Sequence, residues 1–118
     1  MTTHATGRRA EQIARAFLSG QGLKPVEENW HCRLGEIDLI MQERDVLVFV
    51  EVRFRKNSHF GTPAETVGHT KQRHLVLAAH HYLQRFRKPP PCRFDIVAMT
   101  AEPALQMEWI RNAFDATL

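Results

Sequence analysis

The chain has 118 residues, of which 43% are hydrophobic and 25% charged, the composition of a folded globular protein rather than a disordered or fibrous one. This length predicts a single domain, residues 1–118, with one modest core. Sixteen Lys and Arg residues against thirteen Asp and Glu give a net charge of +3, which permits a polyanionic partner without requiring one.

Segments for export or membrane insertion are not expected in this chain. No apolar run is long enough for a membrane helix, and none follows Arg8 and Arg9 as it would in a secretory signal. The two cysteines, Cys32 and Cys92, lie far apart and form no CxxC motif, which argues against a disulfide or a zinc site. We therefore expect a protein of the reducing cytoplasm without membrane contact.

The N-terminal part predicts a helix followed by a strand. Residues 7–21 carry apolar side chains at the spacing of one helical face, and Gly20 and Gly22 are typical of the end of a helix. Residues 23–30 predict a strand. The Lys24-Pro25 step favours an edge position for it, because proline cannot donate a hydrogen bond to a neighbouring strand.

A β-hairpin is predicted next, with strands at 35–42 and 45–54 around a polar turn at 43–45. The second of these strands is apolar on both faces over 46–50. This pattern is typical of a strand in the centre of a sheet, where both faces are covered.

The C-terminal half predicts a second helix over 68–86, which the prolines at 89–91 terminate. A strand follows at 92–99, an additional strand is predicted at 105–110, and a short closing turn at Ala113-Phe114. The order α-β-β-β-α-β, with the extra strand, predicts an α/β fold with a single mixed central sheet flanked by helices.

Charged residues interrupt the apolar pattern of both predicted hairpin strands, at positions that lie opposite each other across the hairpin. In its second strand, Glu51 and Arg53 extend a face that begins apolar, because alternate residues share a face. In its first strand, Glu36 and Asp38 share a face that ends apolar. A turn centred on residues 44–45 places Asp38 opposite Glu51 and Glu36 opposite Arg53, whereas a shift by one residue would move Asp38 and Glu51 to opposite faces.

The same register pairs Ile40 with Phe49, so that apolar pairs gather at one end of the hairpin and carboxylates at the other. Two facing carboxylates repel unless a cation lies between them. Magnesium commonly binds one or two protein carboxylates together with waters and substrate phosphates, and it then supports phosphodiester hydrolysis. The structural alternative is a salt-bridge cluster in which Arg53 neutralises Glu36 and Glu51.

Five sequence blocks carry a resemblance to a known family: GEIDLI at 35–40, VFVEVRFR at 48–55, FGTPAE at 60–65, RFDIV at 93–97 and NAF at 112–114. In their order and spacing, over nearly the whole chain, they resemble the YraN-type family of small, uncharacterised, endonuclease-like bacterial proteins. That family is similar to the PD-(D/E)xK nucleases and, in shape, to archaeal-type Holliday junction resolvases. The resemblance implies a restriction-endonuclease-like fold.

The resemblance also implies a metal site and its residues. In such nucleases an Asp on one strand and a Glu on the next bind Mg or Mn, and a basic residue follows the Glu by two positions. These roles fall on Asp38, Glu51 and Arg53, and Glu11 of the first helix would add to the metal shell. The implied metal ligands are thus Asp38, Glu51 and Glu11, and the implied catalytic residues add Arg53 and Lys71.

The chain departs from that pattern at Arg53, where the superfamily usually has lysine. An arginine, with a pKa above about 12, holds phosphate or stabilises an anion but cannot act as a base. Lys71, four residues before Leu75 in the first turn of its helix, should lean toward the sheet and is a candidate substitute; the alternative is a solvated lysine. For Glu11 the alternative is an intrahelical pair with Arg15, worth only about 0.3–0.5 kcal/mol.

Three further residues are candidates for nucleic-acid binding. Arg55, Lys56 and His59 follow the predicted catalytic strand and are placed to meet a phosphate backbone, although a solvated loop would have the same composition. Asp95, in contrast, is expected to be a structural partner of Arg93 or Arg55.

Two functions of different classes follow from these observations. The first is a metal-dependent endodeoxyribonuclease acting on branched or damaged DNA, with Mg or Mn as cofactor; the resolvase likeness is compatible with a homodimer. The second is a non-catalytic nucleic-acid-binding or assembly protein that retains the nuclease scaffold, which Arg53 favours. A third, a purely structural interaction domain, requires the charged strand ends to serve only as a salt-bridge cluster.

Overall fold

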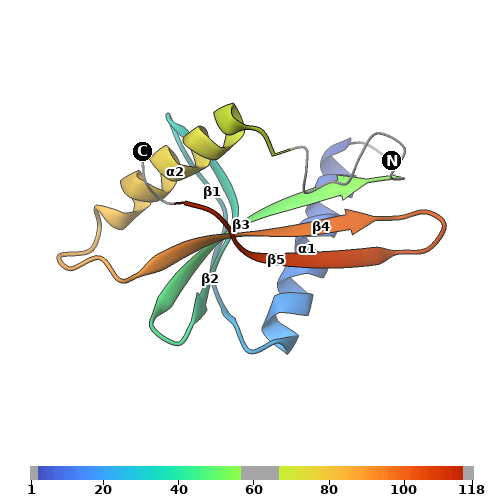
Figure 1. Cartoon of the computed structure of the whole chain (residues 1–118), viewed down its shortest axis with the longest axis horizontal. Coiled ribbons are helices and arrows are strands. Elements are labelled where there is room, and N and C mark those ends of the chain that lie inside the picture. The colour runs from blue at the N-terminus through green and yellow to red at the C-terminus, as the bar shows by residue number, and fades with distance from the viewer. Residues whose placement is uncertain (1–2, 57–66, 116–118) are drawn as a thin grey trace.

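A five-stranded mixed sheet organises the protein. The computed structural model describes residues 3–56 and 67–115. The strands lie side by side in chain order: β1 (Lys24–Cys32), β2 (Gly35–Glu43), β3 (Val46–Arg55), β4 (Cys92–Thr100) and β5 (Gln106–Phe114). Neighbours are antiparallel except β3 and β4, which are parallel. The predicted α/β fold with one mixed sheet is confirmed, with the doubly apolar strand in the centre and the Lys24-Pro25 strand at an edge (Figure 1).

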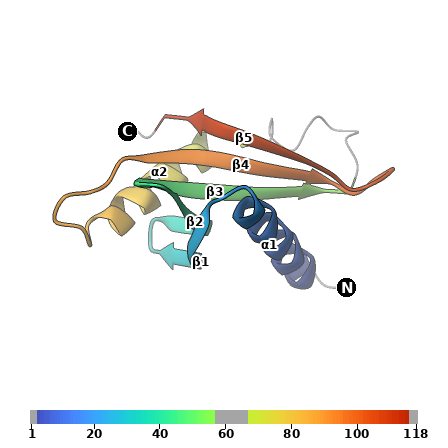
Figure 2. The same cartoon turned by 90° about the horizontal axis from the view of Figure 1, so that it is seen from below.

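Two helices, α1 (Thr3–Gly20) and α2 (His69–Leu83), cover opposite faces of β3. Val48 and Val50 of β3 belong to the core cluster under α1, whereas Leu47 and Phe49 belong to the cluster under α2. Figures 1 and 2 show the helices well separated, one toward each end of the long sheet. α2 is the crossover that two parallel strands require. Neither helix is long and apolar enough, over the described residues, to span a membrane.

The β2–β3 hairpin has the predicted register. Ile40 lies opposite Phe49, and the ladder runs from the pair Glu43–Val46 at the turn to the pair Leu39–Val50. Arg44, in the turn, has a φ of 56°, which a tight hairpin turn requires. The ladder ends before it reaches Glu36 and Arg53, so their predicted pairing is not part of it.

Several boundaries differ from the predictions: α1 begins at Thr3 rather than at 7, β1 continues to Cys32 rather than ending at 30, and two further differences arise near the C-terminus of the sheet and of α2. The closing turn predicted at Ala113-Phe114 is wrong, because both residues belong to β5 and the Phe114 ring stacks on Phe94 at 4.9 Å. The pairing of β4 with β5 shifts register between Phe94 and Ile96, and this shift accommodates the longer strand. Asn112 of β5 lies opposite the shift and has a φ of 52°. The second helix ends at Leu83 rather than at 86, where tighter i to i−3 hydrogen bonds replace the α-helical pattern.

Asp95 is fully buried and every hydrogen bond to it comes from β4 or β5. Arg93 donates to both of its oxygens at 3.0 and 3.2 Å, which confirms the predicted Arg93 partner, and the Trp109 indole and the Asn112 amide donate at 2.9 and 3.0 Å. A buried carboxylate satisfied in this way is structural. It fixes the irregular end of β5 against β4.

Glu43 at the end of β2 joins this network. Its carboxylate accepts hydrogen bonds from Arg93 of β4 at 2.7 Å and from Arg111 of β5 at 2.6 Å. Hydrogen bonds from Arg111 and then Arg93 lower the pKa of Glu43 to about 2. One side chain therefore connects three strands of the sheet.

The Glu43 contacts predict a specific loss of stability in acid. Because the pKa of Glu43 is lowered on folding, its contribution is complete above the unfolded value of 4.5 and is lost as the pH falls toward about 2. We expect the free energy of unfolding of Glu43→Gln, measured by urea denaturation, to lie below wild type at pH 7, to approach it progressively below pH 4.5, and to converge on it only as the pH falls through about 2. Glu102→Gln, which removes the exposed pair with Lys56, is the control and should match wild type throughout. A constant difference across pH would contradict this role of the Glu43 charge.

Candidate metal centre

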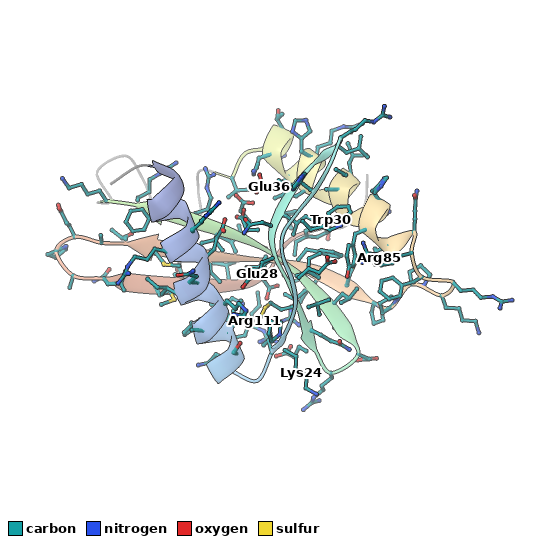
Figure 3. All side chains as sticks on the ribbon, turned by 180° about the vertical axis from the view of Figure 1, so that it is seen from behind. Lys24, Glu28, Trp30, Glu36, Arg85 and Arg111 are labelled. Carbon is teal, nitrogen blue, oxygen red and sulfur yellow. The ribbon has the colours of Figure 1, made fainter. Side chains whose placement is uncertain are left out.

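Asp38 lies at the fork where β2 separates from β3. The paired residues end at Leu39 and Val50, and the next pair in the same register would be Asp38 with Glu51. In place of a backbone acceptor from β2, the Asp38 Oδ2 accepts a hydrogen bond from the Val52 N–H at 2.8 Å. The carboxylate thus ends the ladder, and it is held at the fork by the main chain of the central strand. Figure 3 shows the β1–β2 hairpin passing between the two helices, with Glu36 and Trp30 on the side of α2.

Glu51 is the buried carboxylate of the fork, with only 4% of its surface exposed. Its Oε1 lies 3.7 Å from the Arg53 guanidinium and 3.7 Å from the Lys71 ammonium. Its Oε2 has no hydrogen-bond partner in the described parts of the chain. An unsatisfied buried polar atom costs about 1–3 kcal/mol, and more if charged, so this oxygen is available to accept a hydrogen bond or to coordinate an ion.

Lys71 reaches the fork because α2 approaches the start of β2 very closely. A Cβ at Gly35 would be 3.0 Å from the backbone oxygen of His74, so only glycine fits there without displacing the helix. The Lys71 side chain leans toward the sheet, with its ammonium 3.7 Å from Glu51 Oε1, and it remains 42% exposed. It is thus both solvated and paired with Glu51, and its role in catalysis stays a prediction.

Glu11 comes to the fork from α1. Burial and then the Asp38 charge raise the pKa of Glu11 to about 7, against the opposing effect of a hydrogen bond with the Asn29 side chain. A hydrogen bond with the Asp38 side chain also raises the pKa of Glu11. Its intrahelical alternative is not formed, since Arg15 pairs instead with Glu28 of β1 at 3.0 Å.

The other two carboxyl groups also favour their neutral forms. Burial, then the Asp38 charge, raise the pKa of Glu51 to about 7 against the opposing effects of Lys71 and Arg53. Burial raises the pKa of Asp38, and the Val52 amide and the Lys71 charge only partly offset it. Three carboxyl groups at one place that resist ionisation are typical of a site that receives a cation.

The donor set fits a hard divalent cation that takes part of its shell from elsewhere. Asp38 and Glu51 offer carboxylate oxygens, the ligand type that Mg²⁺ and Mn²⁺ prefer, and Glu51 Oε2 is uncommitted. Within residues 3–56 and 67–115 no three His, Cys, Asp or Glu side chains are arranged to hold an ion by themselves. Mg²⁺ usually retains waters and substrate phosphates, so two carboxylates with Glu11 nearby are sufficient.

The predicted nucleic-acid residues lie past the fork, where β3 ends. Arg55 is exposed and its backbone oxygen accepts a hydrogen bond from Ala101 at 3.1 Å. Lys56 is exposed and lies 3.8 Å from Glu102. His59 falls outside the described residues. These positions stay predictions, since Arg55 and Lys56 are ordinary exposed cations at a strand end.

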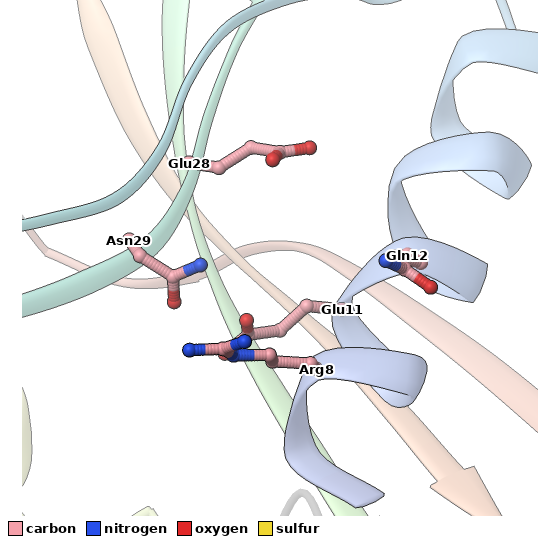
Figure 4. Close-up of a pocket in the computed structure, with 5 residues that line it drawn as sticks. All are labelled: Arg8, Glu11, Gln12, Glu28 and Asn29. Carbon is pink, nitrogen blue, oxygen red and sulfur yellow. The ribbon is translucent and has the colours of Figure 1, made fainter. Parts of the chain in front are cut away.

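Two residues near the fork were not predicted from the sequence. Asn29 turns toward Glu11 from β1, and Arg8 lies beside Glu11 on α1, as Figure 4 shows. Both line a pocket of about 110 Å³, together with Glu11, Gln12 and Glu28. Asn29 has a φ of 51°, a conformation that asparagine accepts more readily than most residues. An asparagine inside a predicted strand was therefore the only hint in the sequence, and the strand pattern itself does not reveal it.

Comparison with known proteins identifies relatives over most of the chain. The model of "Uncharacterised protein family UPF0102" matches residues 10–99, which include every residue of the fork except Arg8. A UPF0102 protein of Nitrosospira multiformis is 50% identical over 98% of this chain and 97% of its own length. A UPF0102 protein of Saccharophagus degradans is 53% identical over 92% of each chain. A third, of Nitrosococcus oceani, is 48% identical over 92% of this chain and 90% of its own.

A neutral side chain at position 51 should stabilise the metal-free protein. Because folding raises the pKa of Glu51, its charge opposes folding above pH 7, and Glu51→Gln removes this penalty while keeping the shape. We expect the free energy of unfolding in EDTA at pH 8 to increase by up to about 3 kcal/mol, the upper bound set by a rise in pKa from 4.5 to about 7 at about 1.4 kcal/mol per unit. Glu28→Gln, an exposed partner of Arg15, is the control and should change by less than about 0.5 kcal/mol.

The structural alternative predicts the opposite sign. If Glu51 served only as an anchor for Arg53 and Lys71, its neutralisation would leave two cations without their partner. Breaking a buried ion pair on one side destabilises by about 3–5 kcal/mol. A loss of that size in Glu51→Gln would assign the cluster to the fold rather than to a ligand.

Proposed function

Because the chain belongs to the uncharacterised protein family UPF0102, whose name assigns no activity, we propose its function from the site itself: a metal-dependent nuclease that hydrolyses phosphodiester bonds in DNA. The observation that carries the proposal is the uncommitted Oε2 of Glu51, buried beside Asp38. Branched or damaged DNA is the substrate that the resemblance to resolvases favours. The cofactor is Mg²⁺ or Mn²⁺, held by Asp38, Glu51 and Glu11.

The carboxylates have distinct tasks in this proposal. A bound divalent ion supplies charge neutralisation on the phosphate and a more acidic water. Asp38 is fixed in orientation by the Val52 amide, so it offers its remaining lone pairs in a set direction. Glu51 offers the oxygen that nothing else occupies. Glu11, whose pKa is raised to about 7 in the metal-free protein, would bind the cation in its ionised form and release its proton on metal binding.

Two cations at Glu51 divide the role that one lysine fills in related nucleases. The Lys71 ammonium, on a flexible stem and partly exposed, is placed to hydrogen-bond a water or a phosphate oxygen next to Glu51. Arg53 follows Glu51 on the same strand and stabilises negative charge without taking up a proton. We therefore assign the positioning of the attacking water to Lys71 and the neutralisation of phosphate charge to Arg53.

A second function has one observation in its favour. Both Lys71 and Arg53 lie 3.7 Å from Glu51 Oε1, so two cations already reduce the charge of this carboxylate before a metal binds. A protein that had lost turnover would retain such a site for holding nucleic acid. A non-catalytic nucleic-acid-binding or assembly protein is therefore the alternative, and it shares with the first proposal a bound phosphate backbone.

Metal binding and cleavage should both depend on Asp38. We expect Mn²⁺ at millimolar concentration to raise the melting temperature of the wild type in proportion to RT ln(1 + [metal]/Kd), and to leave Asp38→Asn unchanged. On nicked, branched and duplex DNA with Mn²⁺ or Mg²⁺, Asp38→Asn and Asp38→Ala should lower the cleavage rate by more than about 100-fold, with the fold intact by circular dichroism. Asp45→Asn, a carboxylate of the distant hairpin turn, is the control. Equal melting shifts for wild type and Asp38→Asn would refute the metal site.

Substitutions at Lys71 and at Arg53 should have different effects on the cleavage rate. We expect Lys71→Met to slow cleavage at saturating metal by about 10²-fold or more while the Mn²⁺ melting shift remains, since an orienting donor near the reacting phosphate typically contributes that much. Arg53→Lys, which keeps the charge, should retain most of the activity. A mutant pair with the reverse order, Arg53→Lys inactive and Lys71→Met active, would assign the water-positioning role to Arg53.

A further inference from the structure

The positive charge of the protein is concentrated in one segment. Between Glu65 and Asp95 the sequence has six Lys and Arg residues, four of the seven histidines and no carboxylate. The remainder of the chain, with ten Lys and Arg against thirteen Asp and Glu, is net negative. Exposed helices commonly mix charges of both signs, so a segment of one sign is a feature of the surface that requires an explanation.

The structure places most cations and imidazoles of this segment along α2 and the turn after it, whereas Arg93 lies on β4 and pairs with Asp95 and Glu43. The inner side of α2 is apolar, with Leu75, Val76, Ala78, Ala79, Tyr82 and Leu83 buried. Its polar residues are consequently directed outward, and the turn after it is exposed as well. We call the exposed cationic and imidazole side chains the α2 basic face: Arg73, His74, His80, His81, Arg87 and Lys88.

Within the described residues, the acidic side chains of neighbouring strands pair with other cations rather than with Arg73, Arg87 or Lys88. Glu27 of β1 pairs with Arg85 at 3.2 Å, and Arg85 also lies over the Tyr82 ring at 3.8 Å, so Arg85 is excluded from the face. Glu51 is the carboxylate that meets Lys71 in the first turn of the helix. Over the described residues, Arg73, Arg87 and Lys88 have no ion pair.

The α2 basic face is continuous with the fork. Lys71 contacts Glu51, and His74, three residues further along, is its neighbour on the helix surface and lies against Gly35 at the start of β2, so this end of the face is one helical turn from the candidate metal centre. Fifteen helical residues extend over about 22 Å at 1.5 Å each. A nucleic-acid strand places one phosphate about every 3.4 Å, so the helix matches the length of roughly six phosphates.

We propose that the α2 basic face binds the phosphate backbone of the nucleic-acid substrate and leads it to the fork. The inference rests on the proposed function for the identity of the partner, and it goes beyond it by assigning the binding surface to α2 rather than to the end of β3. Cations without carboxylate neighbours bind phosphates by charge and release counterions. The face therefore supplies affinity without regard to base sequence, and the fork supplies the chemistry.

A charge-matched pair of triple variants tests the surface. The first variant is Arg73→Gln with Arg87→Gln and Lys88→Gln. The control is Lys24→Gln with Arg44→Asn and Arg15→Gln, which removes the same charge from β1, the hairpin turn and α1; asparagine accepts the positive φ of residue 44. Binding of a fluorescein-labelled 30-base-pair DNA duplex is measured by anisotropy in EDTA over a series of salt concentrations. Melting temperatures confirm that both variants are folded.

We expect the α2 variant to bind at least about 10-fold more weakly than wild type, with the slope of log K against log salt reduced by up to about 2.7, since each phosphate contact contributes about 0.9. The control should remain within about twofold. Equal losses in the two variants would show binding by net charge alone and would overturn the assignment to α2, as would a wild type that binds no duplex.

The same samples distinguish this inference from the proposed function. Wild type that gains a Mn²⁺ melting shift but binds no DNA would overturn the α2 surface and leave the metal site standing. Wild type that binds DNA through α2, with no Mn²⁺ shift and no cleavage, would support the surface and favour the non-catalytic alternative. The expected result is both a metal shift that depends on Asp38 and DNA binding that depends on α2.

Discussion

The hydrogen bond from the Val52 amide to the Asp38 carboxylate is the contact on which the site depends. An antiparallel ladder continues only as long as each backbone donor has a backbone acceptor opposite it. By accepting from Val52 with its side chain, Asp38 satisfies the central strand and allows β2 to leave the sheet after Leu39. The two strands can therefore separate inside the sheet while the Val52 amide keeps a hydrogen-bond partner.

Burial at the fork then determines its electrostatics. Carboxylates at the rim of a sheet would be solvated and would repel weakly, whereas Glu51 is almost completely enclosed and its pKa rises to about 7. The helices on the two faces contribute opposite kinds of group: α1 brings the carboxyl of Glu11, and α2 brings the ammonium of Lys71. Proteins retain such arrangements at functional sites although less charged cores would be more stable.

Most of the architecture could be predicted from sequence because apolar periodicity and turn residues determine it locally. The register of β2 and β3 followed from one turn at residues 44–45, and the confirmed pair Ile40–Phe49 fixes the phase that directs Asp38 and Glu51 to the same site. Helical spacing predicted that Lys71 leans toward the sheet, but not that its ammonium lies 3.7 Å from Glu51. The implied roles in metal binding came from the resemblance, and they stay predictions.

What could not be predicted depends on contacts between distant segments. Arg15 pairs with Glu28 rather than with Glu11, because β1 passes close to α1. The strand continues through Phe114, because Asp95 holds the Asn112 amide and Phe94 stacks on the ring. Neither partner is near in sequence, so no local pattern contains the information.

The segment between Glu65 and Asp95, which contains α2, carries six Lys and Arg residues and no carboxylate, whereas the rest of the sequence is net negative, so charge is unevenly distributed along the chain. In the field of a polyanion such a body experiences a torque as well as an attraction, and it turns its positive side forward before contact. A larger share of collisions then begins in a productive orientation. The rate of association, and not only the strength of the complex, therefore depends on the ionic strength of the surroundings.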